Sequence, residues 1–164
     1  MSLASSLPAA GPGLGRAILV ATLLAGTLDI LDAVITSLIT GRGPVRMLQT
    51  IASAILGKPA LQGGASTALL GLAIHFAIMA VMVTVFVLAA ERLEPLRRQP
   101  ILWGAIYGLA LYGVMTWGVV PLRWPEAFGR LSLIQTANQV FAHSLLVGVP
   151  IALVTARLLK PPAS

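Results

Sequence analysis

Two carboxylates, Asp29 and Asp32, interrupt an otherwise apolar stretch that covers residues 17–39. Residues three positions apart lie on the same face of a helix, so both carboxylates would face the same neighbours. An aspartate at the centre of a bilayer costs about 2.5–3.5 kcal/mol on insertion scales, and such a residue usually faces the inside of a helix bundle. The spacing therefore predicts a polar cluster inside a membrane-embedded bundle.

The other apolar stretches offer partners at matching depths. Counted inward from the same end at about 1.5 Å per residue, His75 falls level with Asp29 and His143 falls near Asp32. Every stretch then contributes a polar group to one half of the membrane. The predicted cluster consists of Asp29, Asp32, His75, Tyr112, Thr116 and His143.

Several kinds of chemistry fit this cluster. Buried carboxylates beside histidines can relay protons or guide cations. They can also form a structural hydrogen-bond network, or line a cavity that binds a lipid or a partner helix. The set Asp29, Asp32, His75 and His143 would suit a divalent metal, but the H-E-x-x-H pattern is absent. We therefore assign no metal and no other cofactor. No nucleophile has a recognisable base beside it, so we expect no enzyme and no catalytic residue.

The composition predicts the fold class. Of 164 residues, 57% are hydrophobic and 10% are charged, and the mean hydropathy is +0.93. Stretches of about 20 apolar residues can cross a bilayer. We expect an all-α, polytopic membrane protein, a four-transmembrane-helix bundle in contact with the lipid bilayer, as a single domain over residues 16–160. The expected spans are residues 17–39, 65–90, 101–120 and 138–159.

The formal net charge of +6 could suggest nucleic-acid binding. However, the Lys and Arg residues lie in the short segments between apolar stretches, where membrane topology places them. We therefore exclude a nucleic-acid partner. The absence of cysteine excludes disulfides, thiol catalysis and covalent haem attachment.

Two segments lie outside the expected spans. Residues 1–15 are rich in Pro, Gly, Ser and Ala and predict a flexible tail. They carry no positive side chain, which argues against a cleaved signal peptide. Residues 44–57 are amphipathic at helical spacing but too short to span, so they predict an interfacial helix. Such a helix could simply cover the bundle or act as a lid over a cavity.

Small residues and a proline shape the last two spans. Gly104 and Gly108 form a G-x-x-x-G pair, which lets helices approach closely within one chain or between two copies. Intrachain packing, a homo-oligomer and a membrane-complex partner all remain open. Pro150 should kink the last span near Leu146.

Lys and Arg are nearly balanced between the two ends of the expected bundle. The short loop of residues 91–100 is strongly basic, and basic loops favour the cytoplasm. We therefore expect both termini of this multi-pass protein to be cytoplasmic.

Several short motifs resemble an uncharacterised family of small four-span bacterial inner-membrane proteins. The resemblance implies four spans and a location in the bacterial inner (plasma) membrane, and it implies no particular activity. It rests on G-T-L-D-I at 26–30, R-M-L-Q-T-I-A-S at 46–53, H-F at 75–76 and G-V-P-I-A-L at 148–153.

Overall fold

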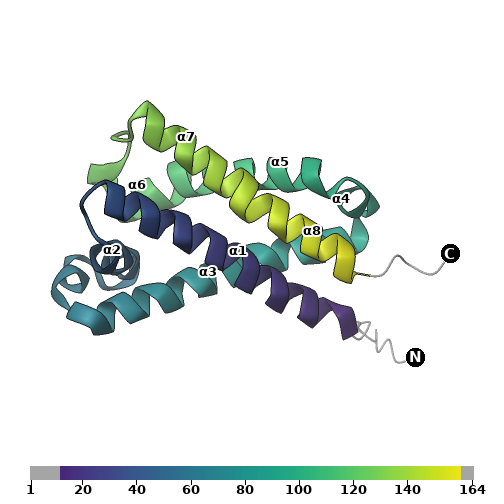
Figure 1. The fold of residues 1–164 in the computed structure, drawn as a ribbon, viewed down its shortest axis with the longest axis horizontal. Helices are drawn as coiled ribbons and strands as arrows, with labels where there is room; N and C mark the ends of the chain where they lie inside the picture. The colour runs from purple at the N-terminus through teal and green to yellow at the C-terminus, as the bar shows by residue number, and fades with distance from the viewer. Residues whose placement is uncertain (1–11, 160–164) are drawn as a thin grey trace, which may run out of the picture.

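The computed structural model describes residues 12–159 and is helical throughout, with no strand among these residues (Figure 1). Four continuous helical rods are long and apolar enough to cross a membrane, so the expected all-α fold class is confirmed. The rods are α1 (Pro12–Ile39); α3 (Gly64–Arg92); α5 (Pro100–Gly113) with η2 (Val114–Val119) and α6 (Val120–Arg123); and α7 (Leu133–Phe141) with η4 (Ala142–Gly148) and α8 (Val149–Leu158).

Shorter elements join the rods. Helix α2 (Pro44–Leu56) and the turn η1 (Lys58–Gln62) connect α1 to α3, while α4 (Glu94–Arg98) connects α3 to α5 and η3 (Pro125–Ala127) follows α6. Both ends of the described chain lie at one end of the bundle, and α2 lies across the opposite end (Figure 1). We call the end at α2 the α2 end.

The helix boundaries differ from the expected ones in the second half of the chain. The third rod runs to Arg123, and the fourth begins at Leu133. Ser132 accepts a hydrogen bond from the Gln135 amide while the Gln135 side chain accepts one from the Ser132 amide, which closes a capping box. The S-x-x-Q pattern was visible in the sequence. In the expected tail, helix α1 already begins at Pro12, and residues 1–11 lie outside the described range.

The last two rods each contain a wide, π-helical turn just before a proline. Because proline has no N–H and its ring crowds the preceding turn, the regular bonding pattern cannot continue there. The amide before each proline bonds to the carbonyl five residues back, from Val120 to Met115 and from Val149 to Ser144. Leu146, near which a kink was expected, lies within the π-helical η4.

An apolar core fills the half of the bundle nearer the termini. On α1, Ala17, Ala21 and Ala25 recur every four residues and are fully buried. Their small side chains let the opposing residues, such as Val83 and Ile151, pack into one cluster. This apolar core lies between the terminal end of the bundle and the α2 end.

The glycines of the third rod pack against the fourth rod of the same chain. A Cβ atom on Gly108 would overlap the backbone carbonyl of His143, and one on Gly148 would overlap that of Gly104. The G-x-x-x-G surface therefore lies inside the monomer, where it brings η4 close to α5.

Candidate functional site

Asp29 and His75 meet between α1 and α3. The Nε2 atom of His75 lies 2.9 Å from the carbonyl oxygen of Gly26. A carbonyl only accepts hydrogen bonds, so Nε2 carries a proton and donates it. The other ring nitrogen, Nδ1, lies 3.9 Å from Asp29 Oδ2. Nδ1 and Oδ2 therefore face each other as two sites that can each hold a proton.

Gly26 makes this contact possible. A Cβ atom at this position would lie 2.7 Å from the ring of Phe76, so a larger residue would displace that ring. The Phe76 ring in turn stands edge-on to His75, with ring centroids 5.2 Å apart. The glycine thus brings α1 and α3 close enough for His75 to reach the α1 backbone.

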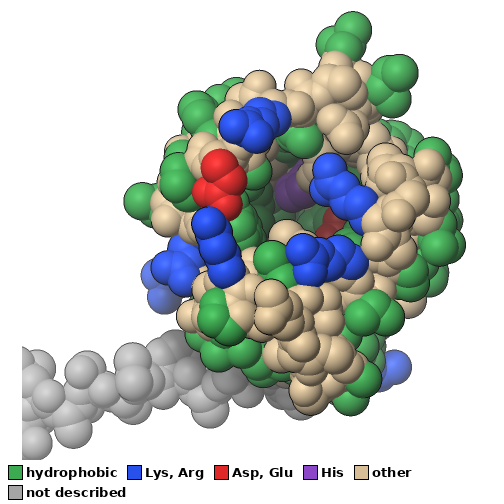
Figure 2. Space-filling model, turned by 90° about the vertical axis from the view of Figure 1, so that its left-hand side faces the viewer, with side chains coloured by type: hydrophobic (Ala, Val, Ile, Leu, Met, Phe, Trp, Pro, Cys, Tyr) green, Lys and Arg blue, Asp and Glu red, His purple; other side chains and the backbone are tan. Residues whose placement is uncertain are grey.

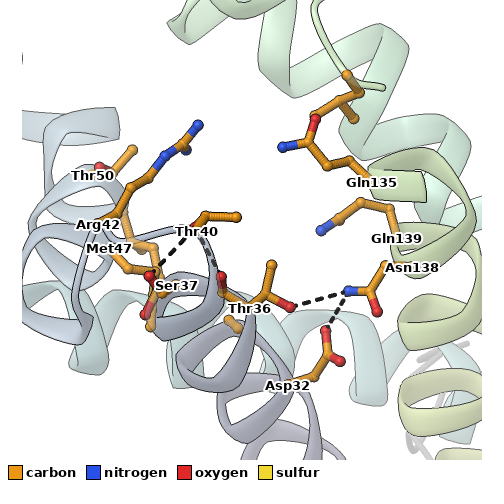
Figure 3. A pocket seen from close by; sticks show the side chains of 13 residues that line it. Asp32, Thr36, Ser37, Thr40, Arg42, Met47, Thr50, Gln135, Asn138 and Gln139 are labelled. Carbon is orange, nitrogen blue, oxygen red and sulfur yellow. Dashed lines mark hydrogen bonds between the residues drawn. The ribbon is translucent and has the colours of Figure 1, made fainter. Parts of the chain in front are cut away.

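Asp32 is tied to the fourth rod by an amide. Asn138 donates through Nδ2 to Asp32 Oδ2 at 2.9 Å, and the same nitrogen lies 3.4 Å from Thr36 Oγ1 (Figure 3). The expected neighbour, His143, instead donates from Nδ1 to the carbonyl of Gln139 at 2.9 Å. Asp32 and His143 line the same cavity without a hydrogen bond to each other.

The two polar residues expected from the third rod are placed differently. Tyr112 is buried and packs its ring against His143, with centroids 6.0 Å apart. Thr116 forms no hydrogen bond with a described residue and does not line the cavities described here. The third rod therefore contributes the Tyr112 ring, packed against His143, and, among the described residues, no hydrogen bond to the cluster.

The cluster faces open space. A cavity of about 230 Å³ lies between the rods and α2, and its wall includes all four of the predicted acid and histidine residues. The Asp29 side chain is 24% exposed and that of His75 is 10% exposed. The remaining wall is mainly apolar, with Ile51 and Ala54 of α2, Met residues of α3 and η2, and Trp124.

A second, more polar cavity of about 290 Å³ adjoins the first at the α2 end. The two share Asp32, Ala33, Ile51 and Gln139 in their walls. Figure 3 shows hydroxyl and amide side chains of α1 and α7 facing this space. Seen from the α2 end, the molecule is hollowed, with histidine and acidic atoms deep inside and Lys and Arg side chains around the opening (Figure 2).

The four residues considered for a divalent metal all line the same cavity. Among residues 12–159, no three His, Asp or Glu side chains come close enough to hold a metal ion together. His75 and His143 each place one ring nitrogen against a backbone carbonyl of a different helix, Gly26 of α1 and Gln139 of α7, and Asp32 is hydrogen-bonded to Asn138. The expected set therefore does not converge on one point.

Two features of the site were missed or understated from the sequence. Asn138 could have been recognised, because an amide in an apolar span needs a polar partner and an acid lay near its depth. The Gly26 carbonyl could not be recognised as a partner from the sequence, because it reaches His75 only through the close approach of α1 and α3.

Fold and site together define an α-helical, multi-pass membrane protein with an acid–histidine cluster in a cavity at one end of its bundle. Comparison with known proteins found no match to a protein-family model, to a curated protein or to a solved structure.

Proposed function

We propose that this protein translocates protons, with Asp29 and His75 as the pair that takes up and releases them. One observation carries the proposal: the pair lies where a cavity open at the α2 end meets the apolar core. The proton on His75 Nε2 is held in the hydrogen bond to the Gly26 carbonyl. A further proton would therefore bind either to Nδ1 or to the Asp29 carboxylate.

Water in the cavity would deliver the proton. Asp32, Gln139 and His143 line the route with polar atoms from two rods. The basic side chains at the opening repel any free cation, but a proton, unlike a metal ion, can also arrive covalently bound to a buffering anion. This favours protons over other cations.

Release on the opposite side requires a second state in which the apolar core opens. The π-helical turns η2 and η4 flank the cluster, and both precede a proline. Helices bend most easily at such points because their hydrogen-bond ladders are already interrupted. We propose that the third and fourth rods bend at these turns, which would close the cavity at the α2 end and connect the Asp29–His75 pair to the opposite side of the membrane.

We place the protein in the bacterial inner membrane with both termini in the cytoplasm, as a member of the four-span family that its motifs resemble. Support comes from the basic connection at the terminal end, which contains Arg92, Arg97 and Arg98. The cavity would then open to the periplasm.

Purified protein in liposomes that contain a pH-sensitive dye tests the function. A potassium gradient with valinomycin sets the membrane potential, and we expect proton entry faster than in protein-free liposomes. A rate equal to that of protein-free liposomes at every imposed potential would refute translocation.

A second candidate is an accessory subunit whose cavity holds a lipid or a partner helix, favoured by the mainly apolar wall and the closed inner end. Absence of flux together with stable co-purification of another membrane protein would favour this function instead.

A further inference from the structure

A third hollow, of about 680 Å³, lies at the α2 end between α2, η1 and the end of the third rod. We call it the vestibule. Its wall carries four basic side chains and a single acidic one, so positive charges exceed negative ones by three. The charged residues are Arg42, Arg46, Lys58, Arg123 and Glu126.

Two of the guanidinium groups are held in place by backbone carbonyls. Arg46 donates from Nη1 to Leu61 O at 2.7 Å, and Arg123 donates from Nη2 to Ala54 O. A guanidinium has five N–H donors, so each side chain keeps further donors for a ligand. Their positions are therefore fixed before anything binds.

The wall between them is also fixed. Trp124 donates from Nε1 to Ser53 Oγ at 2.9 Å, which joins the end of the third rod to α2. Helix α2 is itself seated on α3, because a Cβ on Gly71 would overlap the backbone of Leu48. The vestibule is thus part of the folded bundle and does not depend on a loose loop.

The other two basic residues lack a counter-charge. Within residues 12–159, the side chains of Arg42 and Lys58 form no hydrogen bond or ion pair, and Glu126 pairs with none of the vestibule cations. The positive-inside rule does not account for these four groups, because it favours positive charge on the cytoplasmic side and the α2 end would face the periplasm. An anion would relieve their mutual repulsion.

We infer that the vestibule binds a phosphate group carried by a larger molecule, either a phospholipid headgroup or a soluble phosphate ester. The planar fork of arginine matches phosphate oxygens, and several arginines together suit a group with more than one anionic oxygen. The hollow exceeds the needs of a bare ion and shares Arg42 and Thr50 with the polar cavity beside Asp32. The remainder of the ligand would extend in that direction.

This inference is independent of proton translocation, and binding to the purified full-length protein in a neutral detergent tests it. Glycerol 3-phosphate, followed by calorimetry, probes a soluble ester. Micelles doped with phosphatidylglycerol, compared with undoped micelles by thermal shift, probe a lipid headgroup. We expect one of the two to bind, which identifies the source, and we expect binding to weaken as salt is added.

Arg42→Gln and Lys58→Gln are the informative variants, since neither side chain has a partner to lose among the described residues. Each should lower the affinity about tenfold, in line with loss of one charge-assisted contact. Arg130→Gln is the matched control, because Arg130 lies at the same end but outside the vestibule wall. Asp29→Asn should bind normally. Binding of neither probe, or an equal loss with Arg130→Gln, would overturn the inference.

Discussion

Liposomes that contain the Asp29→Asn variant are expected to take up protons at least about tenfold more slowly than those with the unchanged protein. Asparagine has nearly the same shape as aspartate but cannot accept a proton at neutral pH. Because His75 donates from Nε2 to Gly26, it can exchange a proton only through Nδ1, which faces Asp29 at 3.9 Å. Loss of the carboxylate therefore removes half of the exchanging pair.

Thr84→Val is the control for this prediction. Thr84 lies on the same rod as His75, and among the described residues its hydroxyl bonds only within its own helix, to Ala80 O. Its replacement should leave the flux unchanged. Equal flux from folded Asp29→Asn and unchanged protein would show that the pair takes no part in proton movement.

Gly108→Ala is expected to cause one of the largest losses of stability, with a fall in the free energy of unfolding of about 1–3 kcal/mol, typical of overpacking. The added methyl would overlap the His143 carbonyl, which is backbone and cannot rotate away. The fourth rod would have to shift, and the histidine with it. Unfolding by sodium dodecyl sulfate, followed by circular dichroism, measures the change.

Gly118→Ala provides the matched comparison on the same rod. No atom lies within 4 Å of the position that its Cβ would take, so the stability should stay within a few tenths of a kcal/mol or rise slightly. If both substitutions had the same effect, the close approach of α5 and η4 would not limit stability.

The sequence predicted the spans because apolar length and membrane thickness are directly related. It also predicted that Asp29 and His75 would share a level, since depth along a helix is a simple count of residues. It could not predict the rotation of each helix, which depends on packing. Thr116 consequently lies off the cavity, although its depth suits the cluster.

The cavity itself was beyond sequence reasoning. Its existence depends on α2, whose residues Ile51 and Ala54 form part of the wall, and on the wide turn η4, which carries His143. The packing of α2 against Gly71 does not follow from the periodicity of the sequence, and neither does the shape of the turn before Pro150. The same holds for the convergence of Arg46 and Arg123 on one vestibule, since they are far apart in the chain.

For Asp29 and His75 to exchange protons with one side of the membrane, water must reach the pair from the α2 end and stop at the apolar core. The chain has no cysteine, so single cysteines can report access to an anionic, membrane-impermeant methanethiosulfonate reagent. Ala33 lines both inner cavities, and Val83 is fully buried in the core.

Labelling of these two variants from each side of the membrane is the most direct test. We predict that Ala33→Cys reacts from the α2 end alone and that Val83→Cys reacts from neither side. An unreactive Ala33→Cys, or a Val83→Cys that reacts equally fast, would contradict the account.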